Sequence, residues 1–156
     1  MDLETFNAAT WRDANEALLS WCSSQRFAVT VEAGRPYRSL FALECAVHVA
    51  FDSLTWDDVL EALQAHPRIG ARADGRSAAE QSGVADTDRD ALAAANAEYE
   101  ARFGHIFLIC ASGLTGGQML AALRARLGNH PDTERIVAAR ELAKIAMLRL
   151  REALSS

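Results

Sequence analysis

The residues best suited to acid–base chemistry are concentrated in one short stretch of the sequence. His66 stands at the end of a helical pattern and is followed by Pro67, and the carboxylate of Glu80 and the amide of Gln81 come shortly afterwards. An imidazole titrates close to neutral pH, and a positioned carboxylate can also transfer protons. Irregular segments held between rigid helices commonly carry catalytic groups. The pattern therefore predicts an acid–base site that includes His66 and Glu80.

Purely structural roles for the same residues remain open from the pattern alone. A histidine at a helix C-terminus interacts favourably with the helix dipole, so His66 could simply end a helix. Ser77-x-x-Glu80 fits a capping box, in which the glutamate satisfies a backbone N–H, and Gln81 could be solvated. Arg149 lies between two leucines on the last predicted helix. It could extend to solvent, or its guanidinium group could bind a carboxylate bidentately through two N–H groups.

The histidines and cysteines do not show the spacing of a metal site. The chain contains His48, His66, His105, His130, Cys22, Cys45 and Cys110, with neither His-x-x-x-His nor Cys-x-x-Cys among them. A Gly-x-Ser-x-Gly nucleophile motif is also missing from the sequence. We therefore expect no bound metal. The cysteines are expected to be buried thiols in a reducing compartment.

Length and charge set the broad class of the protein. A chain of 156 residues is expected to fold as one domain, residues 1–156, with a substantial core. The net charge of −5 argues against nucleic-acid binding, although Arg68, Arg72 and Arg76 near His66 favour a small anion. The sequence has no apolar run long enough to span a membrane and no basic N-terminal signal region. We expect a soluble cytoplasmic protein.

Helical periodicity dominates the chain and predicts an all-α fold of about seven to eight helices. The expected helices are residues 9–22, capped by Asn7, then 26–32 and 39–54, and a fourth that starts at Thr55 and ends before Pro67. The helix 39–54 is apolar on more than one face, which is typical of a helix in the centre of a core.

The second half continues this pattern with one interruption. A long helix is expected from Thr87 to a stop at Gly104, and another after a capping box at Thr115 and Gln118. The last helix is expected near residues 132–154. The apolar segment near 105–111 between these helices could be extended or helical, because periodicity does not separate the two.

Four motifs together resemble one known family. They are His66-Pro-Arg-Ile-Gly70, Glu80-Gln-Ser-Gly83, the run from Asn96 through Tyr99, Arg102, Phe103, Gly104 and His105 to Ala111, and the run from Glu141 to Leu150. In this order, in a chain of this length, they resemble the 2-oxo-4-hydroxy-4-carboxy-5-ureidoimidazoline (OHCU) decarboxylase family. The resemblance extends from about Phe6 to Leu150.

The resemblance implies an all-helical, cofactor-free, homodimeric decarboxylase that converts the ureidoimidazoline to (S)-allantoin in urate degradation. It implies the following roles: His66 and Glu80 as catalytic residues, Gln81 and Arg149 as substrate contacts, the backbone of Phe107, Leu108 and Ile109 against the substrate ring, and Pro67 and Ser77 in the pocket wall. No transthyretin-like hydrolase domain follows, so we expect functional coupling to a separate hydroxyisourate hydrolase. The alternative is a non-catalytic helical module that binds ureides or purine breakdown products.

Overall fold

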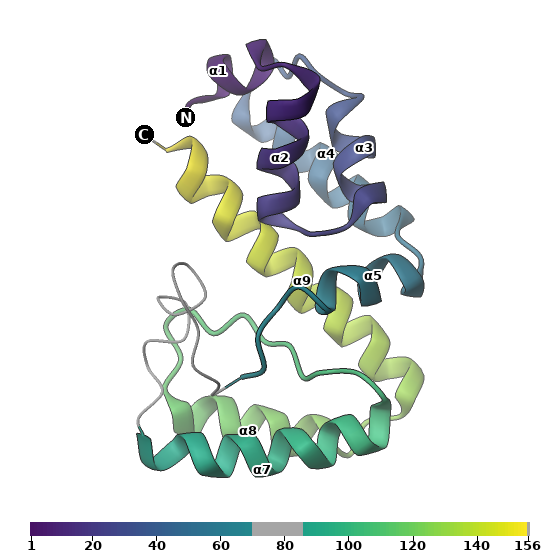
Figure 1. The fold of residues 1–156 in the computed structure, drawn as a ribbon, viewed down its shortest axis with the longest axis vertical. Coiled ribbons are helices and arrows are strands. Elements are labelled where there is room, and N and C mark those ends of the chain that lie inside the picture. The colour runs from purple at the N-terminus through teal and green to yellow at the C-terminus, as the bar shows by residue number, and fades with distance from the viewer. Residues whose placement is uncertain (70–85, 156) are drawn as a thin grey trace. The chain divides into compact units, whose positions relative to one another are not determined.

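The computed structural model describes residues 1–69 and 86–155, and in these ranges the chain forms eight helices and no strand (Figure 1). The prediction of an all-α protein is thereby confirmed. Residue contacts divide the chain into two units. The first unit is Met1–Ala62 with Leu142–Ser156, and the second unit is Leu63–Glu141.

The first unit contains five helices before the chain enters the second. They are α1 (Leu3–Ala8), α2 (Trp11–Trp21), α3 (Gln25–Glu32), α4 (Leu40–Ser53) and α5 (Trp56–Leu63), whose last residue already belongs to the second unit. The capping role predicted for Asn7 is wrong, since Asp2 caps α1 and Thr10 caps α2 with their own side chains. Asn7 lies inside α1 and instead bonds the backbone N–H and C=O of Tyr37, each at 2.8 Å.

Helix α4 is only partly the core helix that its composition indicates. Leu43, Val47 and Ala50 are buried, but Phe41 is 73% exposed and Val49 is 66% exposed. One face of α4 therefore packs in the first unit, and the other carries apolar side chains in contact with solvent. The expectation of buried thiols is also wrong in part, because Cys22 is buried while Cys45 is exposed and Cys110 is half-buried.

The second unit is built on two parallel helices, α7 (Asp86–Phe103) and α8 (Gly116–Arg126) (Figure 1). Their N-terminal ends lie together, because a Cβ added to Gly116 would stand 2.5 Å from a carboxylate oxygen of Asp88. At the other end, the Arg102 side chain donates to the carbonyl of Asn129, just beyond α8, at 2.8 Å. Because α7 and α8 run in the same direction, the chain between them must run back along their length.

That return is made by residues 104–115, which contain no helix. Gly104 starts it with φ of 78°, a left-handed conformation that glycine adopts without strain and that ends α7. The return ends in a capping box between Thr115 and Gln118, as predicted. Between these ends, Phe107, Ile109 and Ala111 pack into the core of the unit. The last helix, α9 (Pro131–Leu154), begins in the second unit and ends in the first.

Candidate active site

His66 lies in the second unit, directly after α5. A reciprocal pair of bonds between Thr55 and Asp58 starts this helix. At its other end the His66 N–H donates to the carbonyl of Leu63 at 3.0 Å. Pro67 then disfavours further helix, so the chain leaves α5 with the imidazole half-buried. His66 thus stands at a helix exit, the position that the sequence predicts.

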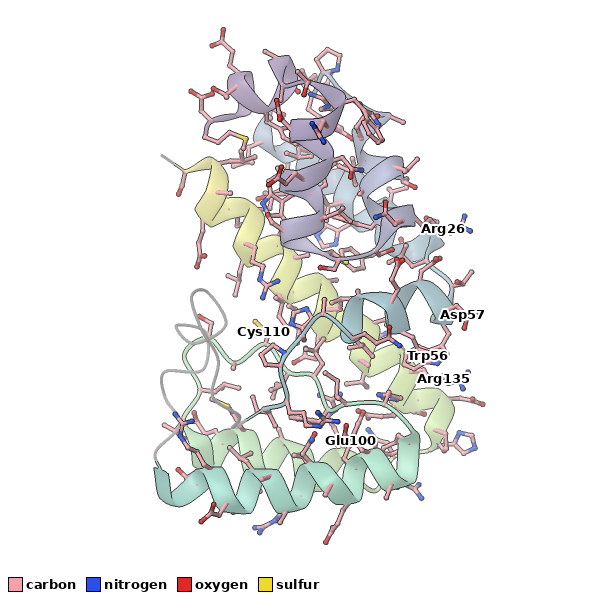
Figure 2. The ribbon with its side chains drawn as sticks, in the orientation of Figure 1. Arg26, Trp56, Asp57, Glu100, Cys110 and Arg135 are labelled. Carbon is pink, nitrogen blue, oxygen red and sulfur yellow. The ribbon has the colours of Figure 1, made fainter. Side chains whose placement is uncertain are left out.

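A chain of polar contacts connects the His66 segment to the apolar return. Glu100 of α7, which is labelled in Figure 2, pairs with Arg68 at 3.0 Å and also accepts a hydrogen bond from the Asn96 amide at 3.0 Å. The amide oxygen of Asn96 in turn accepts from the Phe107 N–H at 3.3 Å. Ile69 adds an apolar link, since it is 5% exposed and packs in the same core cluster as Phe107.

Two further side chains fix the backbone of the return. Arg126, on α8, donates from Nη1 to the Leu108 carbonyl at 2.6 Å. Glu141, on α9, accepts from the Cys110 N–H at 3.4 Å. Together with Asn96, three different helices hold successive backbone groups of this segment. The peptide groups around Phe107, Leu108 and Ile109, whose backbone is predicted to face the substrate, are thus bonded by side chains of the second unit.

Arg126 belongs to a buried charged cluster. Glu134 is fully buried, and its Oε1 accepts from Nε of Arg126 and from the Tyr99 hydroxyl, each at 2.6 Å. Its Oε2 accepts from the Asn129 amide at 3.0 Å. The guanidinium carbon of Arg126 also lies 4.4 Å from the centre of the Phe107 ring. The carboxylate and guanidinium are therefore both held from several directions, as a buried charged pair requires.

Burial governs the ionisation of the groups around this cluster. Burial, followed by the hydrogen bond to Glu134, raises the pKa of Tyr99 and keeps the phenol protonated. Burial also lowers the pKa of His105, whose ring lies edge-on to Tyr99 at 5.5 Å. His105 therefore tends to be neutral, and its Nδ1 lies 3.0 Å from the Ile106 carbonyl.

Arg149 lies on α9 in the first unit, where its side chain is half-buried. Its Nη1 is 3.5 Å from the carbonyl of Ser20, near the end of α2. The predicted residues Ser77, Glu80 and Gln81 lie outside the described residues. The structure therefore places His66, Pro67 and the 107–109 backbone in one unit and Arg149 in the other.

A metal site is not formed by the side chains of residues 1–69 and 86–155, in which no three His, Cys, Asp or Glu groups are placed to hold an ion. None of the helices in these ranges combines the length and apolar character of a membrane span.

The buried charges were not predicted as site residues, although the sequence contains a signal for them. Arg126 follows Met119 and Leu123 at intervals of four and three residues, so it shares their buried face of α8. Glu134, Ala138 and Glu141 show the same spacing on α9. A charge at such a position is informative, because it must find a partner in the core.

The OHCU decarboxylase family model matches residues 7–151. The chain belongs to the OHCU decarboxylase family. A member from Amia calva, 2-oxo-4-hydroxy-4-carboxy-5-ureidoimidazoline decarboxylase, is 33% identical over 136 residues, which cover 80% of this chain and 78% of that protein. The "Uric acid degradation bifunctional protein TTL" of Arabidopsis thaliana is 40% identical over 144 residues, or 83% of this chain. The alignment spans 44% of that relative's length.

Two solved structures share the fold, and one of them is an OHCU decarboxylase. A crystal structure of OHCU decarboxylase in the presence of (S)-allantoin is 35% identical, with a TM-score of 0.79 over 88% of this chain and 96% of that chain. A crystal structure of (S)-allantoin synthase shares the fold, with a TM-score of 0.76 at 20% identity over 99% of this chain and 54% of that chain.

Proposed function

We propose that this chain decarboxylates 2-oxo-4-hydroxy-4-carboxy-5-ureidoimidazoline to (S)-allantoin in urate degradation. The family match over residues 7–151 carries the proposal. The second unit supports it independently. There, the predicted acid–base histidine and the predicted ring-binding backbone are tied together by Arg68, Glu100 and Asn96.

The substrate supplies the electron sink for this reaction, so we propose that no cofactor takes part. When the bond from C4 to the carboxylate breaks, its electron pair forms a C4=C5 bond as CO2 leaves. The former C5=N pair moves to the ring nitrogen, which takes a proton. The C4 hydroxyl then loses its proton to become a carbonyl, and C5 gains a proton on one face. The protein must place the carboxylate, stabilise the enol intermediate and choose the face.

The residues would divide this work as follows. His66 and Glu80 would form the acid–base pair at the C4 hydroxyl and at C5. Gln81 and the backbone of residues 107–109 would bind the ureido and ring amides, and Arg149 would anchor an anionic or carbonyl group. Pro67 and Ser77 would line the pocket.

The test is circular dichroism on substrate generated in place by urate oxidase and hydroxyisourate hydrolase. The substrate decays unaided to racemic allantoin, so a rapid (S)-allantoin signal that withstands a chelator reports the enzyme. His66→Asn should lower kcat by about 10²–10⁴-fold, because it removes a positioned acid–base group. His130→Asn is the matched control: His130 also precedes a proline, its side chain is 71% exposed, and asparagine preserves a cap before α9.

Two results would contradict the proposal in different ways. A His66→Asn enzyme within a few-fold of wild-type activity would remove His66 from the chemistry. A wild-type protein that leaves the rate and the racemic outcome unchanged would favour the alternative, a non-catalytic module for ureides. Calorimetry with allantoin would then show binding that His66→Asn does not weaken.

The setting of the enzyme is also proposed. Residues 1–156 would form a single decarboxylase domain that works in the cytoplasm as a homodimer. The exposed apolar side chains of α4 support self-association. Functional coupling to hydroxyisourate hydrolase is supported by the Arabidopsis relative, whose name describes a bifunctional protein of uric acid degradation.

A further inference from the structure

The backbone N–H and C=O of Ile109 belong to two neighbouring peptide groups. In each of these peptide groups, the other polar atom is hydrogen-bonded to a buried side chain. The Leu108 carbonyl, which shares a peptide group with the Ile109 N–H, accepts from Arg126 at 2.6 Å. The Cys110 N–H, which shares one with the Ile109 carbonyl, donates to Glu141 at 3.4 Å. The N–H and C=O of a trans peptide point in opposite directions. The Ile109 groups therefore point away from Arg126 and from Glu141.

Contact with a charge at one end of a peptide group changes the other end. A guanidinium group that donates to a carbonyl withdraws electron density from the amide, which makes the N–H of that amide a stronger donor. At 2.6 Å the bond from Arg126 to Leu108 is short for a charged N–H donor. The Glu141 carboxylate, which accepts from the Cys110 N–H over a longer distance, makes the Ile109 carbonyl a stronger acceptor, and this effect is weaker.

Net stability does not account for the buried ion pair of Arg126 and Glu134. Arg126 is 8% exposed and Glu134 is fully buried. Two charges in such a site lose most of their hydration, so a buried pair contributes little net stability compared with apolar side chains of similar size. Glu134 nevertheless fixes the guanidinium through Nε, leaving Nη1 directed at the Leu108 carbonyl. The geometric result of the pair is a fixed peptide group at Leu108–Ile109.

We propose that Arg126, held by Glu134, is a positioning residue that fixes the Leu108–Ile109 peptide and strengthens the Ile109 N–H as a donor to a ring carbonyl oxygen of the bound ureidoimidazoline, over which the charge that reaches the ring nitrogen is delocalised. The inference rests on the proposed decarboxylase function. A stronger, prealigned donor stabilises charge that develops as CO2 leaves, which raises kcat more than it lowers KM.

The test replaces both charges at once, so that neither is left unpaired. Arg126→Met keeps the apolar part of the side chain. Glu134→Gln keeps an acceptor oxygen for the Tyr99 hydroxyl, and its NH2 group donates to the side-chain oxygen of Asn129 once that amide is turned over. This paired variant should lose about 10–100-fold in kcat, as when an outer-sphere partner of a catalytic group is removed, with a smaller change in KM. The enantiomeric excess of (S)-allantoin should fall in parallel, because a loosely held substrate accepts the proton on either face.

The matched control is the paired variant Arg35→Met with Glu32→Gln in the first unit. Arg35 also pairs with a glutamate, at 3.1 Å, and donates to backbone carbonyls, including that of Phe6 at 2.6 Å. Those carbonyls belong to α1 and its end. The control should lower the melting temperature without changing kcat or enantiomeric excess, which separates positioning from general loss of stability.

A direct measurement of the hydrogen bond is available because Ile109 is the only isoleucine that follows a leucine in the sequence. Carbon-13 carbonyl leucine combined with nitrogen-15 isoleucine therefore gives a single correlation across the Leu108–Ile109 peptide. In the paired variant the carbonyl resonance should move upfield as the bond is lost. An unmoved resonance would mean that Arg126 does not bind this carbonyl, and would overturn the inference.

The kinetic outcomes also decide the matter. Wild-type kcat and enantiomeric excess in a folded paired variant would overturn the inference, whereas the absence of activity in the wild-type protein would refute the proposed function instead. Should the paired variant fail to fold, Arg126→Lys replaces it, since an ammonium group can neutralise Glu134 but cannot also reach Leu108 in the same geometry. The same drop in kcat is expected there, and an unchanged kcat would overturn the inference.

Discussion

Each unit of the chain contains an arginine that pairs with a glutamate and also donates to the backbone. The two arginines differ in where the accepting carbonyls lie. Arg35 of the first unit donates to the carbonyls of Phe6, Asn7 and Ala9 at the end of α1, and the Phe6 carbonyl also accepts from the Ala9 N–H at 3.4 Å. Arg126 of the second unit donates to Leu108, which lies in the non-helical return between two parallel helices. One arginine completes a helix, and the other shapes an irregular segment.

The cores of the two units show the same difference. Asn96, Arg126, Glu134 and Glu141 make up four of the five buried polar or charged residues in the described ranges, and all four belong to the second unit. The fifth, Ser24, caps α3. Apolar burial is sufficient to hold helices together, whereas buried hydrogen bonds define where individual backbone groups lie. The second unit therefore uses polar contacts where the position of the backbone matters.

The largest expected effect comes from removing one charge of the second unit. Arg126→Met alone leaves the fully buried Glu134 carboxylate without its counter-ion, and should lower the free energy of unfolding by about 3–5 kcal/mol. Arg35→Met should cost less, because the Glu32 side chain remains 21% exposed and water can replace the lost donor. Urea denaturation of both variants measures this. Equal losses of unfolding free energy would show that the two arginines contribute to stability in the same way.

A smaller effect is expected at high pH in the apolar core of the first unit. Burial raises the pKa of Cys22 from 9.0 to about 12, so the folded protein holds this proton more tightly than the unfolded chain. The resulting stability is complete below pH 9 and is lost as the pH rises towards 12.

Between pH 7.5 and pH 10.5, in the presence of a reductant, this thiol should account for about 2 kcal/mol of lost unfolding free energy. Cys22→Ala should lack that part of the loss. The raised pKa values of Tyr37 and Tyr99 act in the same direction, but they are common to both proteins and cancel in the difference. An identical pH dependence in the two proteins would mean that Cys22 is not buried as the first unit places it.

Most of the helices could be predicted, because their apolar spacing and their caps agree. The predicted helices 26–32 and 132–154 begin one residue after the observed helices and end at the same residues. Asn7 was misplaced because α1 was not predicted, and Asp2 and Thr10 are the caps that its presence requires. Which apolar residues are buried was harder to predict, since a periodic pattern does not tell a core face from an exposed one.

The part of the candidate site that depends on neighbouring residues in the sequence could be predicted. Pro67 alone is enough to place His66 at a helix exit. The position of the 107–109 segment depends instead on Asn96, Arg126 and Glu141, which come from three helices. Contacts of this kind follow from tertiary packing, so the resemblance to a family could name the segment but the sequence could not show what holds it.

The smallest effect on stability is expected on the exposed face of α4, and it tests the proposed homodimer. Phe41→Ser combined with Val49→Ser removes side chains that are 73% and 66% exposed, so each protomer should keep its unfolding free energy to within about 0.5 kcal/mol. Light scattering after gel filtration should show the wild-type protein as a dimer and the variant as a monomer, because apolar side chains on this face would be buried between copies. A variant that remains dimeric would place the interface elsewhere. A monomeric variant with unchanged kcat would further show that the chemistry does not require assembly.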